Sequence, residues 1–122
     1  MKSMKSWFLL CGVIAALILV ATYGRPIAAE KEQVIQVTAK RFEYSPKDIT
    51  VKKGVPVVLE FTSLDRLHGF NCPGLGIRTD IQPGKVNRLQ FTADKTGTFP
   101  FHCDNFCGTG HEGMRGTITV TE

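Results

Sequence analysis

The sequence predicts an all-β protein, a sandwich of short strands behind one N-terminal hydrophobic helix. Three observations support this fold class. After residue 30, β-rich runs alternate with turn residues at short spacing, which is typical of a sandwich. The same region has no convincing amphipathic helical pattern. Residues 7–24, by contrast, form an uncharged run, WFLLCGVIAALILVATYG. One domain, residues 30–122, is therefore expected behind a hydrophobic segment at residues 1–29.

The hydrophobic segment is predicted to be a signal peptide or an N-terminal membrane anchor. Lys2 and Lys5 precede the apolar run, and the small residues Ala28 and Ala29 follow it, as in secretory signals. The run is also close to the roughly 20 residues that a membrane span needs. Both alternatives place residues 30–122 in the periplasm or on the extracytoplasmic face of the cell membrane.

The charge of the chain excludes one class of partner. Lys and Arg number 15 and Asp and Glu 11, but Lys2, Lys5 and Arg25 lie in the leader, so the rest is nearly neutral. No basic stripe with interleaved aromatic residues is present, and nucleic acid is therefore not an expected partner.

The expected strands show the alternation of a half-buried sheet. Ile35, Val37 and Ala39 share one face of the first strand, and Leu59 and Phe61 share one face of the third. A turn is expected at Ser45 and Pro46. The predicted strands are residues 34–39, 49–51, 55–61, 86–91, 96–101 and 116–121.

The segment 101–120, FHCDNFCGTGHEGMRGTITV, carries four soft or borderline metal donors. Cys103, Cys107, His111 and Met114 follow the spacing C-x3-C-x3-H-x2-M. Thiolate and imidazole suit copper or zinc rather than magnesium or calcium, and a thioether favours copper. Two other interpretations stay open, a small-loop disulfide between the cysteines and a core position for Met114.

Cys103 bears on how many ions are bound. A mononuclear blue-copper site needs only Cys107, His111, Met114 and one distant histidine. A second thiolate allows two sulfurs to bridge two copper ions, each of which then requires its own terminal ligand. That arrangement demands a second histidine.

Two blocks of the sequence resemble a known family. Residues 103–114, CDNFCGTGHEGM, resemble the ligand loop of the binuclear copper A (CuA) centre of cytochrome c oxidase subunit II and nitrous oxide reductase. Residues 67–85, LHGFNCPGLGIRTDIQPGK, resemble the block with the family's first histidine ligand, here His68. Residues 42–54, FEYSPKDITVKKG, are similar to the early strands of cupredoxins. The resemblance covers residues 34–122 and implies a cupredoxin-like Greek-key β-sandwich with copper loops at one end.

The resemblance also implies a role for each ligand. Cys103 and Cys107 bridge both copper ions, His68 and His111 each cap one ion, Met114 is a weak ligand, and Asn105 supplies its backbone carbonyl. His68 is expected on the loop after the strand that ends near Phe61. The other ligands are expected on the loop between the last two strands.

Two departures from the family concern its partners. Many oxidase subunits have Glu at the position of Asn105, where the carboxylate helps to hold magnesium. The one tryptophan is Trp7, and Phe70 stands where an oxidase commonly has Trp. The sequence therefore leaves a magnesium site and docking by cytochrome c open.

Several other reactive side chains are expected to have no metal role. His102 precedes Cys103 on a strand, so the two side chains point to opposite faces. Cys72 is expected to be a small buried hydrophobe, and Cys11 to have no specific role. Arg78 and Asp80 are expected to form a surface salt bridge.

The predicted function is electron transfer through a two-copper centre, in a subunit II-like protein or a free-standing carrier. A redox donor and acceptor are implied, with cytochrome c and a haem-copper oxidase subunit as candidates. The alternatives are a copper-delivery (Cu(I) chaperone) protein and a mononuclear blue-copper protein. No nucleophile–base pair is evident, so any enzymatic activity is expected to belong to an assembled complex.

Overall fold

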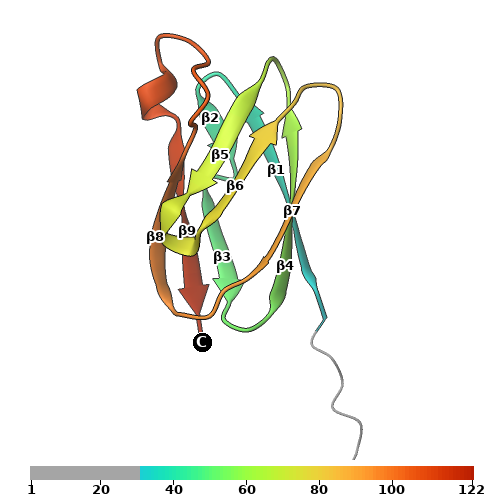
Figure 1. Cartoon of the computed structure of the whole chain (residues 1–122), viewed down its shortest axis with the longest axis vertical. Coiled ribbons are helices and arrows are strands. Elements are labelled where there is room, and N and C mark those ends of the chain that lie inside the picture. The colour runs from blue at the N-terminus through green and yellow to red at the C-terminus, as the bar shows by residue number, and fades with distance from the viewer. Residues whose placement is uncertain (1–30) are drawn as a thin grey trace, which may run out of the picture.

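A computed structural model describes residues 31–122 and shows two β-sheets packed face to face (Figure 1). The predicted N-terminal helix, with the rest of residues 1–29, lies outside the described residues. Within residues 31–122 no helix is long and apolar enough to cross a membrane. The prediction of an all-β sandwich is confirmed for the described part of the chain.

Each sheet combines strands that are distant in the sequence. The first has the order β2-β1-β4-β7 and the second has the order β3-β9-β8-β5-β6. The strands of residues 31–122 are β1 (Gln33–Lys40), β2 (Glu43–Ser45), β3 (Asp48–Lys52), β4 (Pro56–Ser63), β5 (His68–Cys72), β6 (Ile77–Ile81), β7 (Asn87–Thr92), β8 (Gly97–His102) and β9 (Arg115–Thr121). Two 3-10 turns complete the elements, η2 (Pro73–Leu75) and η3 (His111–Gly113).

The pairing brings the candidate ligand segments to one end of the sandwich. β8 runs antiparallel to β9 and to β5, so the end of β8, the start of β9 and the start of β5 lie close together. The loop between β8 and β9, which includes η3, extends from this end (Figure 1). Each sheet contains one parallel pair, β1 with β4 in the first and β3 with β9 in the second.

The six predicted strands agree with the structure to within two residues at each end. Their apolar faces also agree, since Val37, Ala39, Leu59 and Phe61 are at most 1% exposed. The three-residue β2 and the strand β5 were not predicted. Four of the five residues of β5 are buried, so this strand lacks the alternation by which a strand is recognised. His68 is therefore the first residue of a strand, and its expected place on a loop is wrong.

An aromatic cluster of Tyr44, Phe61, Phe70 and Phe101 fills the core beneath the candidate site. The ring centroids of Phe61 and Phe70 are 4.7 Å apart, and those of Phe70 and Phe101 are 4.8 Å apart. Tyr44 meets Phe101 edge to face at 5.0 Å. Phe70 lies two residues after His68 and Phe101 two residues before Cys103. The cluster therefore supports both ligand segments directly.

Truncation of the cluster should destabilise the protein strongly. We expect Phe101→Ala to lower the free energy of unfolding by about 3–5 kcal/mol, because it removes a fully buried ring and leaves a cavity. Val86→Ala is the control, since Val86 is 55% exposed and its truncation should cost less than about 0.5 kcal/mol. Chemical denaturation measures both values, and similar losses would contradict the assignment of this core.

Candidate metal centre

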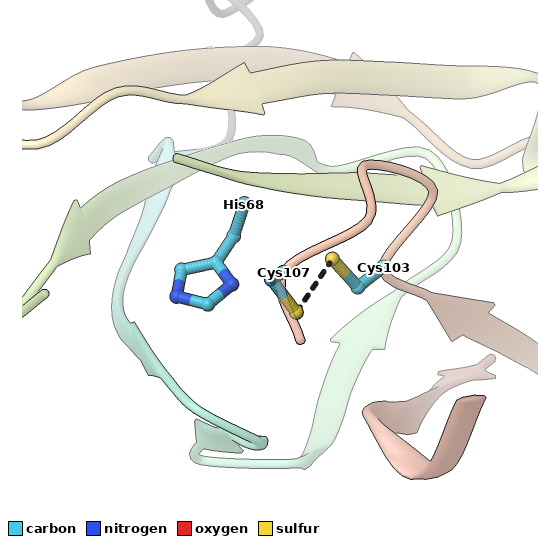
Figure 2. Close-up of side chains that lie close together, drawn as sticks. All are labelled: His68, Cys103 and Cys107. Atoms are coloured by element: carbon cyan, nitrogen blue, oxygen red, sulfur yellow. Dashed lines mark hydrogen bonds between the residues drawn. The ribbon is translucent and has the colours of Figure 1, made fainter. Parts of the chain in front are cut away.

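The centre of the site is a pair of buried thiols on the β8–β9 loop. Cys103 follows β8 directly and Cys107 lies four residues later, with exposures of 3% and 0%. Their sulfur atoms are 3.9 Å apart, and Figure 2 shows them facing each other. A disulfide would require about 2.05 Å, so both cysteines are free thiols here.

His68 approaches the thiols from strand β5 (Figure 2). Ligand atoms of His68, Cys103 and Cys107 all lie within 4.8 Å of one another. The ring is completely buried, and its Nδ1 is, within residues 31–122, a buried side-chain nitrogen without a hydrogen-bond partner. Such orphaned groups are rare in folded proteins and fit a nitrogen meant for a metal ion. Nε2 lies 2.6 Å from Oδ1 of Asp65, which fixes the orientation of the ring.

His111 and Met114 also lie close to the sulfur of Cys107. Nδ1 of His111 lies 3.5 Å from Sγ of Cys107, and Sδ of the fully buried Met114 lies 3.9 Å from the same sulfur. The turn η3 makes this possible, because it reverses the chain between the two residues. The backbone N–H of Cys103 donates to the carbonyl of Met114 at 3.0 Å and fastens the two ends of the loop.

Asn105 contributes both its backbone and its side chain. Its carbonyl oxygen is 3.2 Å from Sγ of Cys103, so all six predicted ligand residues are gathered around the two sulfurs. Its amide donates to the carboxylate of Asp80 at 2.9 Å and to the carbonyl of His68 at 3.3 Å. Sequence reasoning considered only the backbone of Asn105. It missed the side-chain hydrogen bond to the carbonyl of His68, which joins the β8–β9 loop to β5.

Arg78 extends the predicted salt bridge with Asp80 to the ligand loop. Its guanidinium lies 2.7 Å from Asp80 and 2.6 Å from Asp104. A positive side chain thus lies between the two carboxylates nearest Asn105. Asp104 also packs against Gly69, where even a Cβ atom would overlap its carboxylate. A side chain directly after His68 would therefore displace the Asp104 carboxylate from its position beside Arg78.

Tyr44 is a further residue of the site that sequence reasoning missed. Its hydroxyl donates to the carbonyl of Gly69, and the N–H of Gly69 donates to Sγ of Cys103 at 3.4 Å. Burial, and next the neighbouring Cys103 thiol, raise the pKa of Tyr44 above its usual range. The phenol therefore stays protonated and holds the first strand residue after His68 against the thiols.

Burial and hydrogen bonding shift the pKa values of two groups of the site in opposite directions. Burial, and next the nearby Cys103, raise the pKa of Cys107 to about 11. Partial burial opposes ionisation of Asp65, but the backbone N–H of Arg41 and the imidazole of His68 outweigh it and lower the pKa of Asp65 to about 2. Without metal at neutral pH, Cys107 is therefore a neutral thiol and Asp65 is a carboxylate.

His102 and Cys72 lie away from the thiol pair. His102 is exposed whereas the next residue, Cys103, is buried, so the two side chains face opposite sides of the sheet. Cys72 is at the far end of β5 from His68, fully buried, and its thiol is 3.9 Å from the carbonyl of Phe99. It has the environment of a small buried hydrophobe, and burial raises its pKa.

Comparison with known proteins agrees with this fold. The family model of the cupredoxin-like domain matches residues 13–120. The chain therefore belongs to the cupredoxin-like family. Within that family it groups with cytochrome c oxidase subunit 2, represented by two Thermus thermophilus proteins that are each 36% identical over 91 residues, 75% of this chain. The match spans 67% of one of these relatives and 54% of the other.

Solved structures give the same grouping. The periplasmic domain of subunit II of cytochrome oxidase (CoxB) from Bradyrhizobium japonicum superimposes with a TM-score of 0.68 and 25% identity, covering 74% of this chain and 84% of that domain. A mixed disulfide of thioredoxin-like TlpA with subunit II of cytochrome c oxidase matches with a TM-score of 0.62 and 25% identity, covering 74% and 82%.

The donor set present in this chain fits copper. Two thiols, the unpartnered imidazole nitrogen of His68 and the thioether of Met114 are soft or borderline ligands. Membership of the cupredoxin-like family and the group of His68, Cys103 and Cys107 point to the same metal.

Asp65 should control how firmly His68 binds a metal ion. We expect Asp65→Ala to weaken copper affinity by about 10–100-fold, because the ring loses the partner that fixes its orientation. Asp94→Ala is the control, since this exposed carboxylate lies on the β7–β8 loop at the other end of β8. Competition with a Cu(I) chelator measures both affinities, and equal values would contradict a positioning role for Asp65.

The raised pKa of Cys107 predicts how the stability of the metal-free protein depends on pH. An unfolded chain releases this proton near pH 8.5, whereas the folded chain retains it up to about pH 11. Folding is therefore favoured by this group below that window and loses the contribution as the pH rises through it. The melting temperature of the metal-free wild type should fall more steeply there than that of Cys107→Ser. Parallel curves would contradict the assignment.

Proposed function

We propose that this protein transfers electrons through a binuclear copper centre of the CuA type. It would act as a cytochrome c oxidase subunit 2-like protein or as a free-standing extracytoplasmic carrier. The observation that carries the proposal is the 3.9 Å approach of two free, buried sulfurs, each with further donors of its own. A mononuclear blue-copper site uses one thiolate, so it would leave one of these sulfurs without a role.

The contacts support one role for each donor. Cys103 and Cys107 would bridge the two ions as thiolates, and His68 and His111 would each cap one ion. The carbonyl of Asn105 lies next to Cys103, and the thioether of Met114 lies next to Cys107. These two weaker ligands therefore approach different sulfurs, which suits a pair of ions better than one.

The fold supplies what rapid electron transfer requires of a protein. Bound copper would supply one-electron redox chemistry. The chain holds its donors on β5 and on a loop fastened by backbone hydrogen bonds, and it buries His68, both thiols and Met114 away from water. Ligands fixed in this way need to move little when the charge of the centre changes.

The surface over this end supports docking of a redox protein. Leu64, Leu67 and Phe106 are 62%, 41% and 75% exposed, and they lie on the loops that flank the ligands. The Phe106 ring is 5.8 Å from that of His111. Cytochrome c as donor and a haem-copper oxidase subunit as acceptor are the partners we propose. The mixed disulfide formed by a relative also supports a thioredoxin-like reductant that keeps the thiols ready for copper.

We also propose that residues 30–122 function outside the cytoplasm. The Bradyrhizobium relative is a periplasmic domain. Residues 1–29 would then be a signal peptide or a membrane anchor with its span at residues 7–24.

Copper titration followed by electron paramagnetic resonance tests the proposal. We expect two copper ions per chain and the hyperfine pattern of one unpaired electron shared equally by two copper nuclei. Cys103→Ser should abolish that pattern, because a single thiolate remains to bridge the ions. Cys72→Ser is the matched control, since this buried cysteine lies outside the thiol pair and should leave the pattern unchanged.

Each alternative function has its own result in the same titration. One ion per chain, with hyperfine coupling to a single copper nucleus, would identify a mononuclear blue-copper protein. Binding of Cu(I) alone, with rapid transfer to an acceptor and no mixed-valence signal, would identify a copper-delivery protein. Either result would overturn the binuclear proposal.

A further inference from the structure

The turn between β1 and β2 contacts both segments that carry a histidine ligand. Arg41 and Phe42 form this turn, at the end of the sandwich where the ligand loop lies (Figure 1). We propose that it is a positioning clamp, in which Phe42 fixes the turn of His111 and the backbone of Arg41 fixes His68 through Asp65. This inference rests on the proposed function, because it assigns new positioning residues to the same copper site.

Phe42 packs against the glycines that precede His111. A Cβ atom added to Gly110 would lie 2.7 Å from Cγ and 2.8 Å from Cε2 of the Phe42 ring. One added to Gly108 would lie 3.0 Å from the same ring. Real Cβ atoms do not approach other atoms below 3.0 Å, so the ring rests directly on the backbone of this segment.

The backbone conformations of Gly108 and Gly110 show that glycine is favoured at the two positions for different reasons. Gly108 has φ +140, a conformation that itself favours glycine. Gly110 has φ −97 and ψ 8, in the bridge region that non-glycine residues adopt in type I turns. The three atoms nearest to such a Cβ all belong to Phe42, so contact with this ring favours glycine at position 110. The next residue is His111, whose N–H donates to the carbonyl of Gly108 at 3.1 Å, so displacement of this backbone displaces the imidazole.

The other half of the clamp reaches His68. The backbone N–H of Arg41 donates to Oδ2 of Asp65 at 2.8 Å, and Oδ1 of Asp65 lies 2.6 Å from Nε2 of His68. One short turn thus touches the supports of both histidines, which come from different segments of the chain. The turn of Arg41 and Phe42 therefore helps to fix the distance between the imidazoles of His68 and His111.

A pair of glycine substitutions on either side of His111 tests the clamp in the copper-loaded full chain. Gly110→Ala adds a methyl group that meets Phe42, whereas Gly113→Ala adds the same group where nothing lies within 4 Å. We expect Gly110→Ala to change the copper hyperfine pattern and to weaken copper retention about tenfold, within the range for supports of metal ligands. Gly113→Ala should leave both unchanged. Equal spectra for the two variants would overturn the clamp.

A second substitution completes a double-mutant cycle. Phe42→Ala removes the ring that meets the new methyl group, so Phe42→Ala/Gly110→Ala should resemble Phe42→Ala in spectrum and copper retention. Phe42→Ala alone should also alter the spectrum, while the melting temperature of the metal-free chain changes little. Independent, additive effects of the two substitutions, or an unaltered spectrum in Phe42→Ala, would contradict the proposal.

Measurements without copper keep this inference distinct from the proposed function. In the metal-free chain, Phe42→Ala should shift the amide resonances of Gly108, Gly110 and His111 and speed their hydrogen exchange, with no such change at Gly113. Unchanged resonances would overturn the clamp whatever metal the protein binds. A wild type that holds one copper ion would instead overturn the proposed function, with the clamp still supported by its amide shifts.

Discussion

The close approach of two buried thiols is the constraint on which the rest of the site depends. Burial keeps Cys107 protonated far above neutral pH, whereas metal coordination removes a thiol proton outright. Cys107 is therefore a neutral thiol without metal, and its ionisation requires the positive charge that a metal ion brings. The backbone N–H of Gly69 donates to Sγ of Cys103, and the carboxylates of Asp104 and Asp65 are bound to Arg78 and His68 rather than to the sulfurs.

Much of the fold and of the ligand set could be predicted from local sequence. Most of the strands that were recognised alternate between more buried and more exposed residues, and β4, with Val57, Val58 and Leu59 all buried, was recognised from its β-rich run instead. The donors of the β8–β9 loop were recognised because Cys103, Cys107, His111 and Met114 lie within twelve residues. The structure gathers all six predicted ligand residues, although their roles as copper ligands stay predictions.

The supports of the ligands could not be predicted: two of the three act across a long distance in sequence, and the third, Asp65, lies only three residues before His68. Asp65 contacts His68 from a turn, Tyr44 contacts Gly69 from a three-residue strand, and Phe42 contacts Gly110 from the turn between β1 and β2. No local pattern marks these residues, since an aspartate in a turn or an aromatic residue in a strand is ordinary. The glycine at position 110 was the one visible sign, but its cause lies 68 residues earlier in the chain.

The order of the ligands along the chain has a consequence for how the centre matures. His68 leaves the ribosome well before the two cysteines, and Met114 becomes a neighbour of Cys107 only after the hairpin of β8 and β9 has closed. A nascent chain therefore offers no complete donor set to passing ions. The full set of donors comes together only when the sandwich folds, because an unfolded chain presents Cys103, Cys107, His111 and Met114 without His68 beside them.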